Sequence, residues 1–165
     1  MPGLFVTARH FWRSRALISP RAQVQWGAEI TLGRGTVVKA FAVVQSSGGR
    51  ISFGQQCAIS SFVHISTGAG DVIAGDFVRI APNCTLVGTT KEVHSKSVLI
   101  KDQPEFERRG IWIGEDVLIG AGTVVLPGAR IGRGAVIGAN GVVIGTVPEY
   151  AIMAGAPARI IGQRD

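Results

Sequence analysis

Histidine is the residue type best suited to proton transfer near neutral pH, and this chain has three histidines. His10 lies in a basic N-terminal segment, where we expect a solvated side chain. His64 directly precedes the apolar residue Ile65 at an outward position, so it either lines a groove or is inert. His94 stands in a polar, charged stretch, where it is either simply exposed or a general base. His94 is therefore the first candidate for catalysis.

The positions of the two cysteines argue against a disulfide or a cysteine nucleophile, and the spacing of the histidines argues against a zinc site. Cys57 and Cys84 occupy small positions within an apolar pattern, so we expect buried core residues rather than a disulfide or a nucleophile. A catalytic zinc ion needs three convergent protein ligands. Only His64 and His94, thirty residues apart, are candidates to contribute imidazoles to such a site. No metal is expected.

A six-residue repeat must position these side chains. Each unit opens on an apolar residue and has a small residue at its fifth position. Three triplets of units begin at Leu32, Phe53 and Ala74, and an unbroken run follows from Ile113 through Ile119, Val125, Ile131, Ile137 and Val143. A sixfold period predicts an all-β, single-stranded parallel β-helix, in which three short faces close one triangular coil. The first and fifth residues of each unit should point inward.

Glycine often follows the residue that opens a unit. We expect these glycines to serve corners that need unusual φ and ψ angles. They are Gly33, Gly54, Gly75, Gly114, Gly120, Gly132 and Gly138.

The repeat is interrupted between Leu86 and Ile113. These two unit-opening residues are 27 apart, so 21 residues are inserted beyond one unit. Insertions in solenoids lie on the surface, often on the binding face, and loops on a rigid scaffold commonly carry function. The inserted loop, at about 88–112, contains His94 and is where we expect the chemistry.

Composition and charge indicate one globular domain. Of 165 residues, 46% are hydrophobic and 17% charged. We expect an N-terminal cap at 1–29, the β-helix at 30–147 and a tail at 148–165.

The net charge of +6 leaves anionic partners open, but no Lys/Arg run is interleaved with aromatic residues as in nucleic-acid-binding segments. The basic, partly apolar first eighteen residues either cap the helix or touch a membrane. We expect cytoplasmic residence, because no signal peptide or spanning segment is evident.

The segments Ile111–Gly128 and Val147–Ile161, the latter with the pattern V-P-x-Y-x-I-x-x-G-x-P-A-R, resemble the hexapeptide-repeat acyltransferases. This family includes maltose, galactoside and serine acetyltransferases and the O-acetyltransferases of bacterial surface polysaccharides. The resemblance covers roughly residues 30–162. It implies a left-handed β-helix, usually a homotrimer, that binds acyl-CoA in a groove between neighbouring subunits.

The resemblance also implies roles for individual residues. His94 matches the catalytic histidine, which takes a proton from the acceptor hydroxyl and then protonates the CoA thiolate. Either Glu92 or a backbone carbonyl would orient its imidazole. The family's CoA-binding positions fall on Gly120, Ala121, Gly138, Ala139, Ile144 and Arg159, and Arg164 would add to the phosphate contacts.

Three departures refine this hypothesis. Leu118 replaces a frequent tryptophan, Ile144-Gly145 replaces a common Thr-Lys, and His94-Ser95 replaces the His-Pro of maltose and galactoside enzymes. The last change moves the expected substrate away from the small sugars of those enzymes and toward the surface-polysaccharide enzymes. The function that the resemblance implies is transfer of an acetyl group from acetyl-CoA to a hydroxyl or an amine of a sugar or surface-polysaccharide precursor. Two alternatives remain. One is a non-catalytic trimeric scaffold. The other is a γ-type zinc carbonic anhydrase, a class whose sequence pattern has two histidines five apart and a third, distant one.

Overall fold

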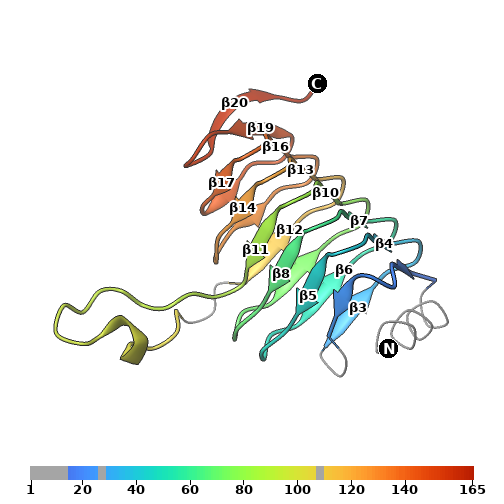
Figure 1. Ribbon diagram of the computed structural model, residues 1–165. Coiled ribbons are helices and arrows are strands. Elements are labelled where there is room, and N and C mark those ends of the chain that lie inside the picture. Colours follow the sequence, from blue (N-terminus) through green and yellow to red (C-terminus); the bar gives the residue numbers. More distant parts are fainter. Residues whose placement is uncertain (1–14, 26–28, 107–109) are drawn as a thin grey trace.

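The repeat folds into a left-handed parallel β-helix whose coils stack along one axis, with one long loop projecting from its side (Figure 1). The structure, a computed structural model, describes residues 15–25, 29–106 and 110–165. Within these ranges no helix is long and apolar enough to cross a membrane. The predicted fold class is confirmed.

Three sheets, here called A, B and C, form the three faces of the helix. Sheet A consists of β1 (Leu17–Ile18), β4 (Val37–Val38), β7 (Ala58–Ile59), β10 (Arg79–Ile80), β13 (Leu118–Ile119), β16 (Val136–Ile137), β19 (Ala151–Ala154) and β20 (Arg159–Gln163). Sheet B consists of β2 (Gln23–Val24), β5 (Val43–Gln45), β8 (His64–Ser66), β11 (Thr85–Val87), β14 (Val124–Val125) and β17 (Val142–Val143). Sheet C consists of β3 (Ile30–Leu32), β6 (Ile51–Phe53), β9 (Val72–Ala74), β12 (Ile111–Ile113), β15 (Arg130–Ile131) and β18 (Thr146–Val147).

Corners named after the sheets they join connect these strands. Corner AB comprises residues 39–42, 60–63, 81–84, 120–123 and 138–141 in successive coils. Corner BC comprises 46–50, 67–71, 88–106 with 110, 126–129 and 144–145. Corner CA comprises 33–36, 54–57, 75–78, 114–117 and 132–135.

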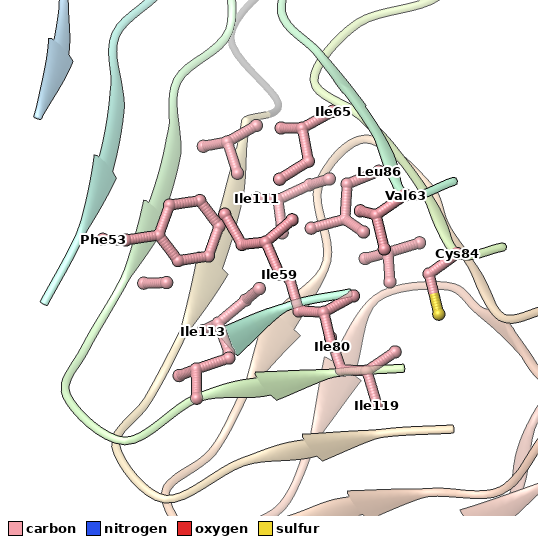
Figure 2. Close-up of a cluster of buried hydrophobic side chains, with 14 of the residues drawn as sticks. Phe53, Ile59, Val63, Ile65, Ile80, Cys84, Leu86, Ile111, Ile113 and Ile119 are labelled. Carbon is pink, nitrogen blue, oxygen red and sulfur yellow. The ribbon is translucent and has the colours of Figure 1, made fainter. Parts of the chain in front are cut away.

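The unit-opening residues stack in register inside the helix. Ile59 pairs with Ile80, and Ile80 pairs with Ile119, so one aliphatic side chain lies over the next (Figure 2). These side chains are almost completely buried. Full burial of an aliphatic side chain contributes about 1.5–3 kcal/mol, so the repeated column is the main source of stability.

The small fifth position points inward at corners AB and CA but not throughout corner BC. Cys57 and Cys84 are buried as predicted, whereas Gly48, Ala69 and Thr90 are exposed, so the prediction for those three is wrong. The reason is that corner BC holds the extra residues of the longer coils, which carry the fifth position out of the core.

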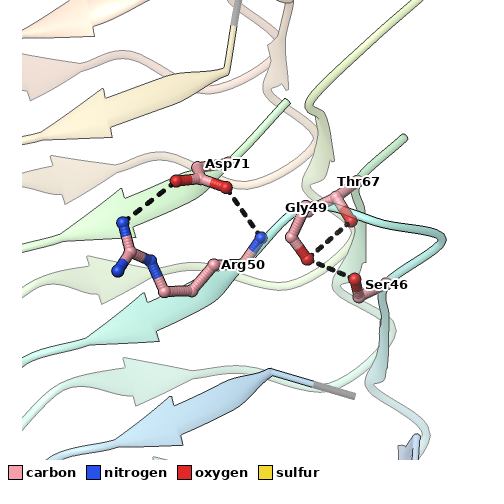
Figure 3. Close-up of polar contacts among 5 residues, drawn as sticks. All are labelled: Ser46, Gly49, Arg50, Thr67 and Asp71. Carbon is pink, nitrogen blue, oxygen red and sulfur yellow. Dashed lines mark hydrogen bonds and ion pairs between the residues drawn. The ribbon is translucent and has the colours of Figure 1, made fainter. Parts of the chain in front are cut away.

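Polar contacts close these longer corners. The Asp71 carboxylate accepts hydrogen bonds from the backbone N–H of Arg50 at 2.8 Å and from its guanidinium at 3.2 Å (Figure 3). The carbonyl of Gly49 accepts hydrogen bonds from the hydroxyls of Ser46 and Thr67 (Figure 3). Side chains thus pair backbone groups of Gly49 and Arg50 that lie outside the strands.

The regular coils extend past both expected boundaries. β1 and β2 pair with β4 and β5, and Ile18, Ala22 and Val24 are buried in the same spacing as later units. Residues 1–14 of the expected cap lie outside the described residues. At the other end, β19 continues sheet A and β20 folds back on it in antiparallel fashion, which ends the sheet.

The glycines after the unit-opening residues have a different cause from the one predicted. Neither Gly33 nor Gly114 has a positive φ. A Cβ atom on Gly33 would instead lie 2.4 Å from the carbonyl carbon of Gly54, and one on Gly114 would lie 2.6 Å from the amide nitrogen of Arg133. Close stacking of successive coils therefore requires glycine here. The left-handed conformation occurs two residues later, at Gly35, Gln56, Phe77, Asp116 and Gly134.

Candidate active site

The described residues of the insertion, 88–106 and 110, belong to a projecting arm between β11 and β12, longer than the other described corners (Figure 1). Its two limbs are joined by backbone hydrogen bonds from Glu92 to Pro104 at 2.9 Å and from Phe106 to Thr90 at 2.7 Å. The arm is thus a paired element close to its root, and a 3₁₀ turn, η1 (Ile100–Asp102), lies on the limb that returns toward β12 (Figure 1).

Gln103 holds the outer part of the arm together. Only 4% of this residue is exposed, and its side-chain amide donates to the carbonyls of Ser95 and Val98 at 3.1 and 3.0 Å. Its carbonyl oxygen Oε1 accepts a longer hydrogen bond from the Ser95 N–H, and its backbone carbonyl accepts one from Lys91 Nζ at 3.1 Å. Gln103 could not be identified from the sequence, because a single glutamine in a polar loop carries no distinctive signal.

His94 lies on this arm, with one imidazole nitrogen against a carboxylate. Its side chain is 83% exposed, and Nε2 lies 3.0 Å from Oε2 of Glu92. That Oε2 atom is buried and has no hydrogen bond of standard geometry to any described residue. Glu92 is therefore placed to orient His94, while the rest of the imidazole remains open to a reactant.

Four of the predicted CoA-binding residues form one smooth surface on corner AB. A Cβ atom on Gly120 would lie 2.6 Å from the amide nitrogen of Ala139, and the Asn140 N–H donates to the Ala121 carbonyl at 2.8 Å. Gly120-Ala121 and Gly138-Ala139 therefore stack directly in adjacent coils, and both alanines are exposed. The absence of bulky side chains leaves the backbone open to an extended ligand.

The other predicted CoA contacts lie elsewhere. Ile144 is exposed on corner BC, and Arg159 is exposed on β20 at the end of sheet A. Arg164 donates to the Asp116 carboxylate at 3.0 Å and to the Gly134 carbonyl at 2.9 Å, so its guanidinium secures the chain end to corner CA. The structure thus brings the four corner AB residues together but does not gather all predicted site residues on one face of a single chain.

The remaining candidates lie apart from the arm. His64 is half-buried on β8 with its side chain on the outer face of sheet B, between Val43 and Thr85 of the adjoining strands. The sulfurs of Cys57 and Cys84 lie 3.2 and 3.1 Å from backbone carbonyls. Burial raises the pKa of both thiols, so they are protonated at neutral pH.

Both cysteines are free, which confirms the expectation of core residues. In the part of the chain that the structure describes, no three His, Cys, Asp or Glu side chains cluster as ligands for a metal ion.

Sequence comparison places this chain among known transferases. A family described as "Bacterial transferase hexapeptide (six repeats)" matches residues 110–145. A probable acetyltransferase, Rv3034c, of Mycobacterium tuberculosis is 30% identical over 143 residues, which cover 87% of this chain and 45% of the relative. The putative lipopolysaccharide biosynthesis O-acetyl transferase WbbJ of Escherichia coli is 33% identical over 144 residues, which cover 84% of this chain and 70% of that protein.

Solved structures agree on the fold. AntD, an N-acyltransferase from Bacillus cereus solved with dTDP and 3-hydroxybutyryl-CoA, superposes with a TM-score of 0.79 at 20% identity, covering 92% of this chain and 81% of AntD. The acetyltransferase domain of PglB from Neisseria gonorrhoeae, solved with acetyl coenzyme A, gives a TM-score of 0.67 at 25% identity, covering 88% of this chain and 57% of that chain.

Proposed function

Since this chain belongs to the bacterial hexapeptide-repeat transferase family, we propose that it moves an acetyl group from acetyl-CoA to a sugar or surface-polysaccharide precursor. The observation that carries the proposal is the arm, which presents the exposed imidazole of His94 against the buried Glu92 oxygen. A histidine with a carboxylate at ion-pair distance is an arrangement that recurs in general-base catalysis. Relatives named as acetyltransferases support the acetyl donor.

His94 has two proton transfers to perform in this reaction. It accepts the proton of the acceptor hydroxyl or amine as that group attacks the thioester carbonyl carbon, and the carbon–sulfur bond to CoA then breaks. The imidazolium returns its proton to the departing thiolate, so the enzyme ends as it began. Glu92 stabilises the transient imidazolium through its carboxylate at 3.0 Å. General-base help of this kind contributes about 10²–10⁴ in rate.

The corner AB surface suits the pantetheine arm of CoA. Ala121 and Ala139 are exposed at successive coils, so an extended chain can lie against the backbone there. Arg159, exposed on β20 at the end of sheet A, offers a cation for the phosphates. Ile144 lies on corner BC, at the other edge of sheet B, so it would contact the ligand only from a neighbouring copy. The bound acyl-CoA of AntD and acetyl-CoA of PglB support a donor of this chemical class.

The acceptor is proposed to bind on the outer face of sheet B below the arm. His64, Ser66 and Thr85 lie there half-buried, and their side chains form no hydrogen bond with other described residues. Hydroxyl and imidazole groups, which form hydrogen bonds with alcohols, match a hydroxyl-rich sugar. The name of the E. coli relative, which refers to lipopolysaccharide biosynthesis, supports that class.

In this proposal, two copies of the chain contribute to one site. The arm with His94 leaves corner BC, whereas the glycine–alanine surface lies on corner AB, at the opposite edge of sheet B. A homotrimer, in which the arm of one copy reaches toward corner AB of the next, would unite the two halves. In this homotrimer, acetyl-CoA would bind between neighbouring copies.

The test is a thiol-release assay with acetyl-CoA and a panel of nucleotide sugars and oligosaccharides. Wild-type protein should release CoA with at least one acceptor, and His94→Ala should lower kcat by about 10²–10⁴. Ser97→Ala, an exposed change on the same arm, is the matched control and should retain the wild-type rate. Equal rates for the His94 variant and wild type would remove His94 from the mechanism.

A further inference from the structure

The outer part of the arm, residues 95–103, here called the Gln103 loop, exposes three consecutive large apolar side chains. Val98 is 44% exposed, Leu99 67% and Ile100 60%. No other run of three exposed large apolar residues occurs among the residues that the structure describes. The arm stands out from the side of the β-helix, so the core of the chain does not cover these side chains (Figure 1). An apolar patch of this kind marks a contact surface.

The polar groups of the Gln103 loop face inward instead. The buried side-chain amide of Gln103 donates to the carbonyls of Ser95 and Val98. Backbone N–H groups of the loop donate to the carbonyls of Leu99 and Ile100 at 2.9 and 3.2 Å. The N–H of Val98 donates to the Ser95 hydroxyl at 3.2 Å. The carbonyls of all three exposed apolar residues are therefore paired within the loop.

A polar interior beneath an apolar exterior suits an apolar environment. Loops at a water-exposed surface can leave backbone groups to water, so they do not need this internal pairing. Inside a lipid layer no water is present, and each unpaired backbone group would cost several kcal/mol, so pairing within the protein is required. Leu99 and Ile100 can leave water with their carbonyls already satisfied.

Charge next to this apolar patch indicates an anionic partner. Lys96 is exposed and forms no ion pair with a described carboxylate. Lys101 is neutralised by Asp102 at 2.7 Å, and Lys91 Nζ binds a backbone carbonyl rather than a carboxylate. The whole chain has a net charge of +6. Apolar side chains beside unneutralised lysines are the combination that binds an anionic lipid surface.

The same charge argues against a neighbouring copy as the partner of the Gln103 loop. Sheets A and B and corner AB have no carboxylate among their described residues, and they carry exposed cations such as Lys39 and Arg79. Lys96 on that surface would meet like charges, which is unfavourable. The proposed trimer needs only His94, which precedes the loop, to lie at corner AB.

We propose that the Gln103 loop docks on an anionic lipid bilayer, with Leu99 and Ile100 in the apolar layer and Lys96 among the headgroups. His94 directly precedes the loop, so docking would hold its imidazole near the membrane surface. The inference rests on the proposed function in one respect: it makes the acceptor a surface-polysaccharide precursor attached to a membrane lipid. Lipid binding by the loop does not itself depend on acetyl transfer.

The test measures co-sedimentation of the full chain with vesicles of phosphatidylglycerol and phosphatidylcholine, and with vesicles of phosphatidylcholine alone. Wild type should bind the mixed vesicles, and Leu99→Ser/Ile100→Ser should bind them at least about tenfold more weakly. Ile160→Ser/Ile161→Ser is the matched control, because these side chains are 60% and 68% exposed but lie on β20, and it should bind like wild type.

Lys96→Glu supplies a second test that leaves the apolar side chains intact. This charge reversal should weaken binding to the mixed vesicles and leave binding to phosphatidylcholine alone unchanged. Unchanged binding of Lys96→Glu to the mixed vesicles would overturn the anionic surface as the partner. Absence of wild-type binding, or equal binding by wild type and the Leu99/Ile100 variant, would overturn the docking itself.

Two further measurements separate this inference from its alternatives. Far-UV circular dichroism and sedimentation velocity should show that the Leu99/Ile100 variant is folded and has the oligomeric state of wild type. A changed oligomeric state, with no binding of wild type to vesicles, would overturn the docking in favour of a second copy. In the thiol-release assay with soluble acceptors, vesicle binding without acetyl transfer would refute the proposed function alone. Transfer without vesicle binding would refute only the membrane contact.

Discussion

At the scale of single residues, the most informative contact is the one between His94 and Glu92. The Glu92 oxygen that faces the imidazole is buried yet lacks a hydrogen bond of standard geometry to any described residue. A buried, unpaired carboxylate oxygen is costly unless it stabilises a nearby positive charge. An imidazolium formed during proton transfer would supply that charge, so we assign Glu92 a positioning role.

Glu92→Gln should therefore lower kcat by about tenfold or more, and by less than the 10²–10⁴ expected for loss of the base itself. The amide keeps the shape of the side chain but cannot offset an imidazolium charge, so the KM for acetyl-CoA should change little. Steady-state kinetics measure both constants. Glu105→Gln, on the opposite limb of the arm, is the control. Equal kcat values for the two variants would contradict the positioning role.

At the scale of the element, the six-residue units explain the solenoid and its tight stacking. The six-residue pattern predicted unusual φ and ψ angles at Gly33 and Gly114, and that cause was wrong. The glycines are needed because the next coil lies too close for a Cβ atom. Both the φ angles and the distances between strands depend on how the coils stack. Two residues after each of these glycines the backbone does turn left-handed, at Gly35 and Asp116. The need for a residue without a Cβ atom and the left-handed residue two positions later both recur at corner CA, from residues 33–36 to residues 132–135.

Gly114→Ala should destabilise the helix by about 1–3 kcal/mol, since the added Cβ would lie 2.6 Å from a backbone nitrogen in the next coil. Gly162→Ala is the matched control, because its Cβ would come no closer than 3.8 Å to another atom and should change stability by only about 0.5 kcal/mol. Urea unfolding followed by circular dichroism measures the difference. Coincident unfolding curves for the two variants would contradict the prediction, because they would show that the coils move apart around the added Cβ atom with little loss in the free energy of unfolding.

At the scale of the whole molecule, scaffold and chemistry are separable. β11 and β12, which flank the arm, take their strand partners from the coils above and below: β8 and β14 for the first, β9 and β15 for the second. The arm's internal contacts, centred on Gln103, do not contribute to these ladders. The solenoid should therefore fold without the arm.

Replacing residues 89–109 by a short linker of the length used in the other coils tests this separation. The variant should unfold within a few degrees of wild type, because all three sheets keep their pairing. Acetyl transfer should fall by at least the 10²–10⁴ expected for loss of the base. Differential scanning calorimetry and the thiol-release assay measure the two effects. A variant that retained transfer would place the base outside the arm.

Sequence alone determined the β-helix, its buried column and the insertion that carries His94. It could do so because a six-residue period is a local pattern that each coil repeats. The first coil was missed, although Ile18, Ala22 and Val24 follow the same spacing, since a single coil is too short to stand out as a repeat.

Only the tertiary structure decided which corner each residue occupies. It placed Glu92 against His94, buried Gln103 within the arm, and put the predicted CoA contacts on different edges of the helix. It also showed that Phe41 and Phe62, far apart in sequence, stack on the corner that carries Ala121 and Ala139. These relations depend on how coils lie over one another and on which side of the triangle a corner falls, and no six-residue window contains that information.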